Sequence, residues 1–162
     1  MATTTPDAVI IAIEALIVGL RPAGADIKGQ SNEYVVTGDR DSHVDWETRS
    51  EGNVDRHFQI TEFEPVEFVT FGGGERDITA NLVVQVGHIA GNFAVTRNRR
   101  VNDIYQLIVQ LTRPANHDAI SGLHAIFPNL SSDAAPIKDG KYVVTTLGFP
   151  AQFALSANYG GS

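Results

Sequence analysis

Three aspartates in a turn-rich stretch have the spacing that comes nearest to a metal site. Asp39, Asp41 and Asp45 occupy relative positions 1, 3 and 7, as carboxylates do in an EF-hand calcium loop. Such a loop also needs a glycine at position 6 and a bidentate glutamate at position 12, because the chain must turn sharply around the ion. Here those positions hold Val44 and Ser50. We therefore interpret the stretch as a solvated acidic loop and expect no metal or other cofactor.

The histidines do not have the spacing of zinc ligands either. They are His43, His57, His88, His117 and His124. None forms an i, i+4 pair on one predicted helix, which is the usual way for a helix to present two imidazoles to one ion. His57 and His88 fall on predicted strands, where we expect polar-face residues or core residues with hydrogen-bond partners.

Other reactive motifs are also absent from the sequence. The run from Gly72 to Gly74 is followed by a predicted strand and not by a lysine and a helix, so it predicts a hairpin turn and not a phosphate loop. No serine lies in a nucleophile-elbow context, no carboxylate pair stands out, and the chain has no cysteine. We therefore predict no catalytic residue and no enzymatic activity.

One basic cluster, Arg97, Arg99 and Arg100, begins a predicted helix. Cations at this end oppose the helix dipole, so local stability does not explain them. They could pair with acidic groups of a neighbouring subunit, contact nucleic-acid phosphates, or simply be solvated. A formal charge of −7 argues against a general nucleic-acid binder, which favours the protein contact over the nucleic-acid one. The candidate residues of a subunit interface are Arg97, Arg99, Arg100, Asp39, Asp41 and Trp46.

The elements that must position these residues follow from hydrophobic periodicity. A helix is predicted over residues 7–20, with Thr5 as its cap and Pro6 at its first position. Strands are predicted at 33–37, 56–63, 65–71, 77–89 and 141–149, and the helix that carries the arginines runs to Leu111. Residues 118–127 are predicted as a short helix and 129–138 as a loop. The apolar residues from 8 to 20 are too few to span a bilayer.

This order of elements predicts an α+β fold, in which two helices pack on one face of a mainly antiparallel sheet. Of the 162 residues 43% are hydrophobic and 19% charged, which is typical of a globular chain. We predict a single domain over 1–162, with a long loop or insertion around 38–53 and a flexible tail at 157–162.

The pattern resembles the tail-terminator (tail-completion) proteins of long-tailed bacteriophages, which join head to tail. The likeness covers most of the chain and is carried by helix 7–20, strand 77–89, helix 97–111 and strand 141–149. Chain length, acidic charge and lack of cysteine agree with that family. The insertion at 38–53 departs from the family pattern, so no residue role is transferred.

The resemblance implies a structural virion protein that forms a ring, usually a hexamer, at the head-proximal end of the tail. Such a ring stops polymerisation of the tail tube, and its partners are the tube protein and a neck or head-completion protein. It is assembled in the host cytoplasm, and DNA passes through its lumen without specific binding. Alternatives are another neck or tail-tube component, a small-ligand-binding α+β module, and, more distantly, a metal enzyme using Asp39, Asp41 and Asp45.

Overall fold

The computed structural model describes residues 5–37, 45–46, 54–70, 76–91 and 93–155. The predicted tail at 157–162 and most of the predicted insertion at 38–53 lie outside these residues. In chain order the elements are α1 (Pro6–Val18), β1 (Val35–Val36), β2 (His57–Thr70), β3 (Arg76–Ile89), α2 (Phe93–Leu111), α3 (Pro114–Asp118), β4 (Leu123–Ile126), β5 (Ser131–Ile137) and β6 (Tyr142–Leu155).

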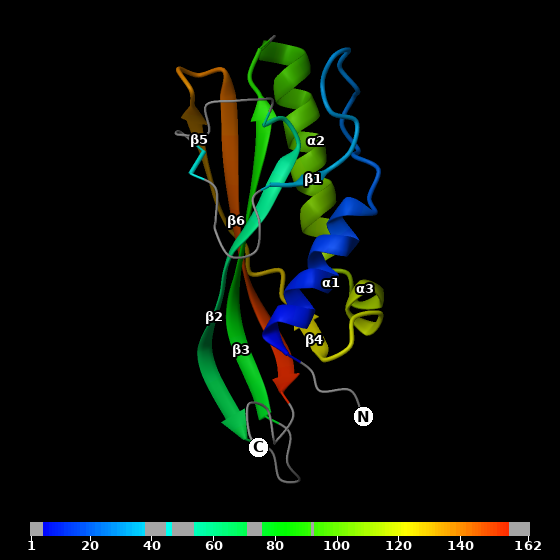
Figure 1. Ribbon diagram of the computed structural model, residues 1–162, viewed down its shortest axis with the longest axis vertical. Coiled ribbons are helices and arrows are strands. Elements are labelled where there is room, and N and C mark those ends of the chain that lie inside the picture. The colour runs from blue at the N-terminus through cyan, green and yellow to red at the C-terminus, as the bar shows by residue number, and fades with distance from the viewer. Residues whose placement is uncertain (1–4, 38–44, 47–53, 71–75, 92, 156–162) are drawn as a thin grey trace.

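A long, twisted sheet forms the body of the molecule, and the helices lie along one side of it (Figure 1). The strand order is β1-β2-β3-β6-β4, and β5 pairs with the other half of the same edge of β6. All strand pairs are antiparallel except the short parallel pairing of β1 with β2. The predicted α+β class is confirmed.

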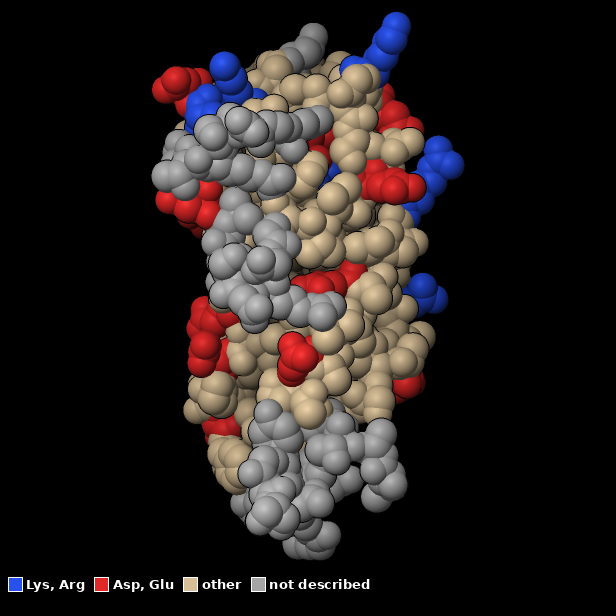
Figure 2. All heavy atoms as spheres, viewed as in Figure 1, with Lys and Arg blue, Asp and Glu red and all other residues tan. Residues whose placement is uncertain are grey.

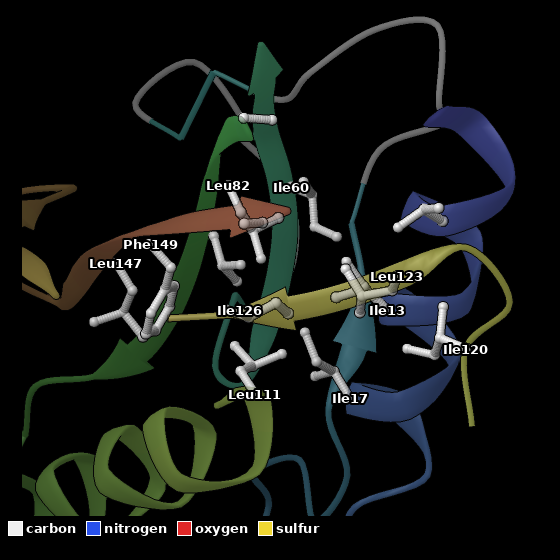
Figure 3. Close-up of a cluster of buried hydrophobic side chains, with 14 of the residues drawn as sticks. Ile13, Ile17, Ile60, Leu82, Leu111, Ile120, Leu123, Ile126, Leu147 and Phe149 are labelled. Carbon is white, nitrogen blue, oxygen red and sulfur yellow. The ribbon is translucent and has the colours of Figure 1, made fainter. Parts of the chain in front are cut away.

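The core lies between the sheet and the helices, as the alternation in β3 predicts. Its residues Ile78, Ala80, Leu82, Val84 and Val86 are at most 5% exposed. Their side chains leave the pleat on one face because successive strand residues point to opposite sides. Figure 3 shows how side chains from α1, α2 and β4 meet this face in one cluster.

The first helix begins where its capping residues predict. The Thr5 hydroxyl accepts a hydrogen bond of 3.0 Å from the backbone N–H of Ala8, and Pro6 occupies the first turn, where its missing N–H costs nothing. The helix ends at Val18, two residues before the predicted end, and Gly19 forms its C-terminal cap.

Two predictions in the second half of the chain are wrong. The helix predicted at 118–127 is instead the short helix α3, which ends at Asp118, followed by strand β4. Gly122, with φ of 83°, turns the chain between them. The loop predicted at 129–138 contains β5. Both strands pair with β6, and this long-range pairing overrides the weak local preferences of their sequences.

Two predicted strands around Glu64 are one continuous strand, β2. Its pairing with β3 shifts register after Ile60 and again after Pro65, which is where an extra residue is accommodated. On its outer edge β2 pairs with β1 only through His57 and Phe58. Within the described residues, the remainder of this edge has no strand partner.

Gly87 in β3 is a position where the fold has no room for a side chain. A Cβ added there would lie 2.6 Å from the Val54 carbonyl oxygen, whereas one added at Gly91 would meet nothing closer than 3.9 Å. We expect Gly87→Ala to lower the free energy of unfolding by about 1–3 kcal/mol, because backbone must move to admit the methyl group. Denaturant unfolding of Gly87→Ala and the control Gly91→Ala measures this, and equal stabilities of the two variants would contradict it.

Candidate functional site

Two buried arginine–aspartate pairs form the most concentrated group of charges in the described structure. Arg56 approaches Asp103 with Nε 2.7 Å from Oδ2 and Nη2 3.2 Å from Oδ1. Arg99 approaches Asp55 with Nη1 2.6 Å from Oδ1 and Nη2 2.7 Å from Oδ2. All four residues are at most 1% exposed. Both pairs are bidentate, which is the geometry that the planar guanidinium favours.

Two segments position these four side chains. Asp55 and Arg56 lie in the turn before β2, where Arg56 has a left-handed backbone with φ of 56°. Arg99 and Asp103 are four residues apart on α2, so both lie on the helix face that packs on the sheet. The backbone direction at Arg56, unusual for a residue other than glycine, is maintained by the contacts of its side chain.

The pairs also hold the segment that connects α1 to β1. Arg56 makes five hydrogen bonds, as many as a guanidinium has N–H groups, and two of these go to the Gly24 and Ser31 carbonyls. The Asp103 carboxylate accepts a hydrogen bond of 2.7 Å from the Gly24 N–H. Arg99 donates to the Ala25 carbonyl at 2.7 Å and to the Ser31 carbonyl at 3.0 Å. The connecting segment is in neither a helix nor a sheet, so the ionic cluster provides hydrogen-bond partners for its backbone groups.

His88 of β3 completes the cluster. Its Nε2 lies 2.8 Å from Asp103 Oδ2, while Nδ1 is buried with no hydrogen-bond partner. A protonated ring would leave a buried N–H without an acceptor, so the geometry favours a neutral imidazole that donates from Nε2. Burial accordingly lowers the pKa of His88 below its ordinary value of 6.5, although Asp103 opposes the shift. With His88 neutral, the charges of the two pairs cancel.

Burial and hydrogen bonding act in opposite directions on Asp103. Burial raises the pKa of this carboxyl group, but the hydrogen bonds from His88 and Arg56 outweigh burial and hold the pKa below 3.8. Asp103 is therefore ionised at neutral pH. Although His88 and Asp103 are a pairing that acid–base enzymes use, both are fully buried and paired within the chain. The cluster therefore joins α2, β3 and the turn before β2 from the inside.

The residues predicted for a subunit interface are scattered by the fold. Arg97 is exposed and its guanidinium lies 5.2 Å from the centre of the Phe93 ring, and Arg100 is half-buried at the surface. Arg99 is buried and paired with Asp55, so its prediction as a surface contact is wrong. The three arginines are adjacent in sequence, but successive positions on a helix face different directions.

Trp46 is also not a surface residue. It is 7% exposed and packs with Val54, Ile137 and Val144, and its indole N–H donates to Gln85 Oε1 at 2.8 Å. The prediction that Trp46 lies in a subunit interface is therefore wrong. Asp39 and Asp41 lie outside the described residues, and Asp45 is exposed. Among the described residues, no group of acidic residues and histidines could hold a metal ion.

A groove between α2 and the β5–β6 pair is the concave surface most relevant to binding. It has a volume of about 380 Å³, and the half-buried residues Val101, Ile104 and Ile108 form its helical wall. Leu130 and Asp133 belong to the opposite wall. A smaller hollow that includes Arg97 shares Arg100 with it, so the two form one concave surface along α2. We call this surface the α2 groove.

The most exposed of the large apolar side chains that the structure describes lie on α2 and near the end of β2. Phe93 is 77% exposed and Tyr105 is 65% exposed on α2, and Val66 and Phe68 near the end of β2 are 62% and 58% exposed. α2 begins at the upper end of the molecule and β2 ends at the lower end (Figure 1). In the lower part of the face in Figure 2, the charged side chains in view are acidic.

Comparison with known proteins does not assign the chain to a family, because no family model matches it and no curated protein is significantly similar. Among the described residues, the helices are all too short or too polar to cross a bilayer.

The buried ion pairs predict a large effect of removing one partner. We expect Asp103→Asn to lower the free energy of unfolding by about 3–5 kcal/mol, because the buried Arg56 would retain only the exposed Asp26 as a counter-charge. Exposed Asp118 provides the control, and Asp118→Asn should change the same quantity by less than about 0.5 kcal/mol. Urea unfolding monitored by circular dichroism measures both, and similar midpoints for the two variants would contradict a dominant role of the cluster.

The neutral state of His88 predicts loss of stability in mild acid. Its folded-state pKa is lowered, so the unfolded chain binds the extra proton first and stability declines as pH falls below 6.5. The slope contributed by this one group approaches about 1.4 kcal/mol per pH unit. The ionised Asp103 contributes a similar loss only below pH 3.8, outside this window.

Unfolding free energies measured from about pH 7.5 to about pH 5 test the assignment to His88. Gln can still donate to Asp103 but does not titrate, so His88→Gln should have a flatter pH dependence than the parent chain. An equally steep decline in both proteins would show that other groups cause it.

Proposed function

We propose that this chain is a structural subunit that assembles with copies of itself into a closed ring, and that the ring is the tail terminator of a bacteriophage. The observation that carries the proposal is the presence of strongly exposed apolar side chains on two separate elements, Phe93 and Tyr105 on α2 and Val66 and Phe68 on β2. Large exposed apolar side chains favour protein contacts, because a partner that covers them removes their surface from water. Two different patches on one chain suit a head-to-tail contact, which closes into a ring when the rotation between subunits permits.

The sheet face that points away from the core supports a lumen for DNA. Glu62 of β2 lies on this face, paired across to Val83 of β3, so a ring would present one such carboxylate from each subunit. A lumen lined by such carboxylates would repel phosphate, so DNA could pass without binding. In this proposal the two rims of the ring contact the tail tube and a neck protein, and the protein is part of the virion after assembly in the host cytoplasm.

The interior of the chain is consistent with a role that needs no catalytic residue. The buried aspartates and arginines pair with one another, the arginines hold backbone carbonyls, and His88 Nε2 contacts Asp103. A subunit of an assembly contacts its neighbours through surfaces on different helices and strands. Those contacts form only if the helices and strands keep the same relative positions, which the buried cluster maintains.

A second candidate function is a small-ligand-binding module, and the α2 groove favours it. The groove lies between a helix and the sheet, and its volume of about 380 Å³ is within the range of ligand pockets. Its apolar wall, formed by the partly buried Val101, Ile104 and Ile108, would bind an apolar molecule.

Solution mass tests the ring directly. Light scattering over a range of protein concentrations should reveal a closed species near six subunits, and negative-stain imaging should reveal rings, because a head-to-tail contact that closes has a fixed subunit number. The ring should be indifferent to chelators. A chain that stays monomeric up to its solubility limit would overturn the proposal, and thermal stabilisation of that monomer by a small apolar molecule would favour the second candidate.

A further inference from the structure

We propose that the ring contact is made by the end of β2 of one subunit, which docks in the α2 groove of the next. This inference rests on the proposed ring and names the two surfaces that would form it. We call the docking segment the acidic arm and define it by Glu64, Val66, Glu67 and Phe68.

The groove offers an apolar wall with cations at one end. Val101, Ile104 and Ile108 are only half-buried within the chain, so a partner that covers them would remove further apolar surface from water. Arg100 lies in the groove and Arg97 in the adjoining hollow, and neither belongs to an ion pair among the described residues. Asp133 is the opposing charge in the groove, and it lies on the wall formed by β5.

The acidic arm has the complementary composition. Its apolar residues Val66 and Phe68 are more than half exposed, and Glu64 and Glu67 beside them are exposed. Phe68 pairs with Ile78 on the core-facing side of the sheet, whereas Glu64 and Glu67 pair with residues of the opposite face. Since the outer edge of β2 has no strand partner here within the described residues, a groove that receives this edge can contact both faces.

We infer that the acidic arm of a second copy of the chain occupies the α2 groove. The arm is acidic and the helical end of the groove is basic, so the two surfaces attract each other. They cannot meet within one copy, because β2 ends at the opposite end of the molecule from the start of α2 (Figure 1). A contact between two different patches of identical chains is the heterologous contact that a ring requires.

Simple strand addition at the sheet edges is a poorer account of the contact. The open edge of β2 contains Pro65 and two shifts of register, and β5 contains Pro136 and Asp133. Proline and charge on edge strands oppose pairing with a further strand, since proline has no N–H to donate. Side-chain docking in a groove has no such requirement.

Charge reversal on each surface gives a test with complementary variants. R97E/R100E makes the groove acidic while its arm stays acidic, and E64R/E67R makes the arm basic while its groove stays basic. Each variant alone therefore juxtaposes like charges, and we expect its self-association to be about tenfold or more weaker than that of the parent chain. An equimolar mixture juxtaposes opposite charges at every contact, so it should form rings in which the two variants alternate.

Light scattering of each variant and of the mixture provides the measurement, and one affinity-tagged variant should recover the other in equal amount. Circular dichroism and melting confirm that both variants fold, and the exposed Arg113 provides a control, R113E, which should assemble like the parent chain. Parent rings together with undiminished rings of each variant would overturn the arm-and-groove contact and leave the ring itself standing. Loss of assembly in the variants without recovery in the mixture would also overturn it, whereas a monomeric parent chain would overturn both proposals.

Discussion

The paired burial of Arg56 with Asp103 and of Arg99 with Asp55 is the constraint on which the remainder of the structure depends. Taking four charges out of water is unfavourable by several kcal/mol for each ion. The chain offsets this because both pairs are bidentate and most of the remaining donors have a backbone carbonyl or the Asp26 carboxylate as acceptor. Such pairs are a weak source of net stability compared with apolar residues of the same size. Their role here is to specify one fold, because few arrangements of the chain give both arginines and both aspartates their partners.

That requirement fixes elements that have few apolar contacts of their own. The segment between α1 and β1 contains no described helix or strand, and its carbonyls at Gly24, Ala25 and Ser31 are held by the two arginines. Gly24 must lack a side chain, because an added Cβ would collide with the Arg99 carbonyl and the Asp103 carboxylate. The same cluster sets the position of α2 along the sheet through His88 of β3. The helix, the strand and the connecting segment therefore form one unit.

The ionic cluster also accounts for the surface that we propose for assembly. On α2 the innermost positions are Thr96, Arg99, Asp103, Leu107 and Leu111, so polar residues occupy the first half of the buried face. This turns Val101, Ile104 and Ile108 partly toward solvent, where they form one wall of the α2 groove. An amphipathic helix with an apolar stripe centred on its core-facing side would have left no such wall. The orientation of α2 thus has two consequences: it buries Arg99 and Asp103, and it leaves the apolar wall of the α2 groove partly exposed.

Local patterns in the sequence determined the α+β class, the cap at Thr5, the turn residues and the inward face of β3, because capping and alternation act over a few neighbouring residues. They did not reveal that Arg99 and Trp46 are interior residues, or that β4 and β5 are strands. One signal was available: Arg99 and Asp103 continue the spacing of Leu107 and Leu111, which places charges on a buried stripe. Their partners, Asp55, Arg56 and His88, lie on other elements, and only the tertiary structure brings them together. The satisfaction of a buried charge depends on groups distant in sequence, so no local pattern can specify it.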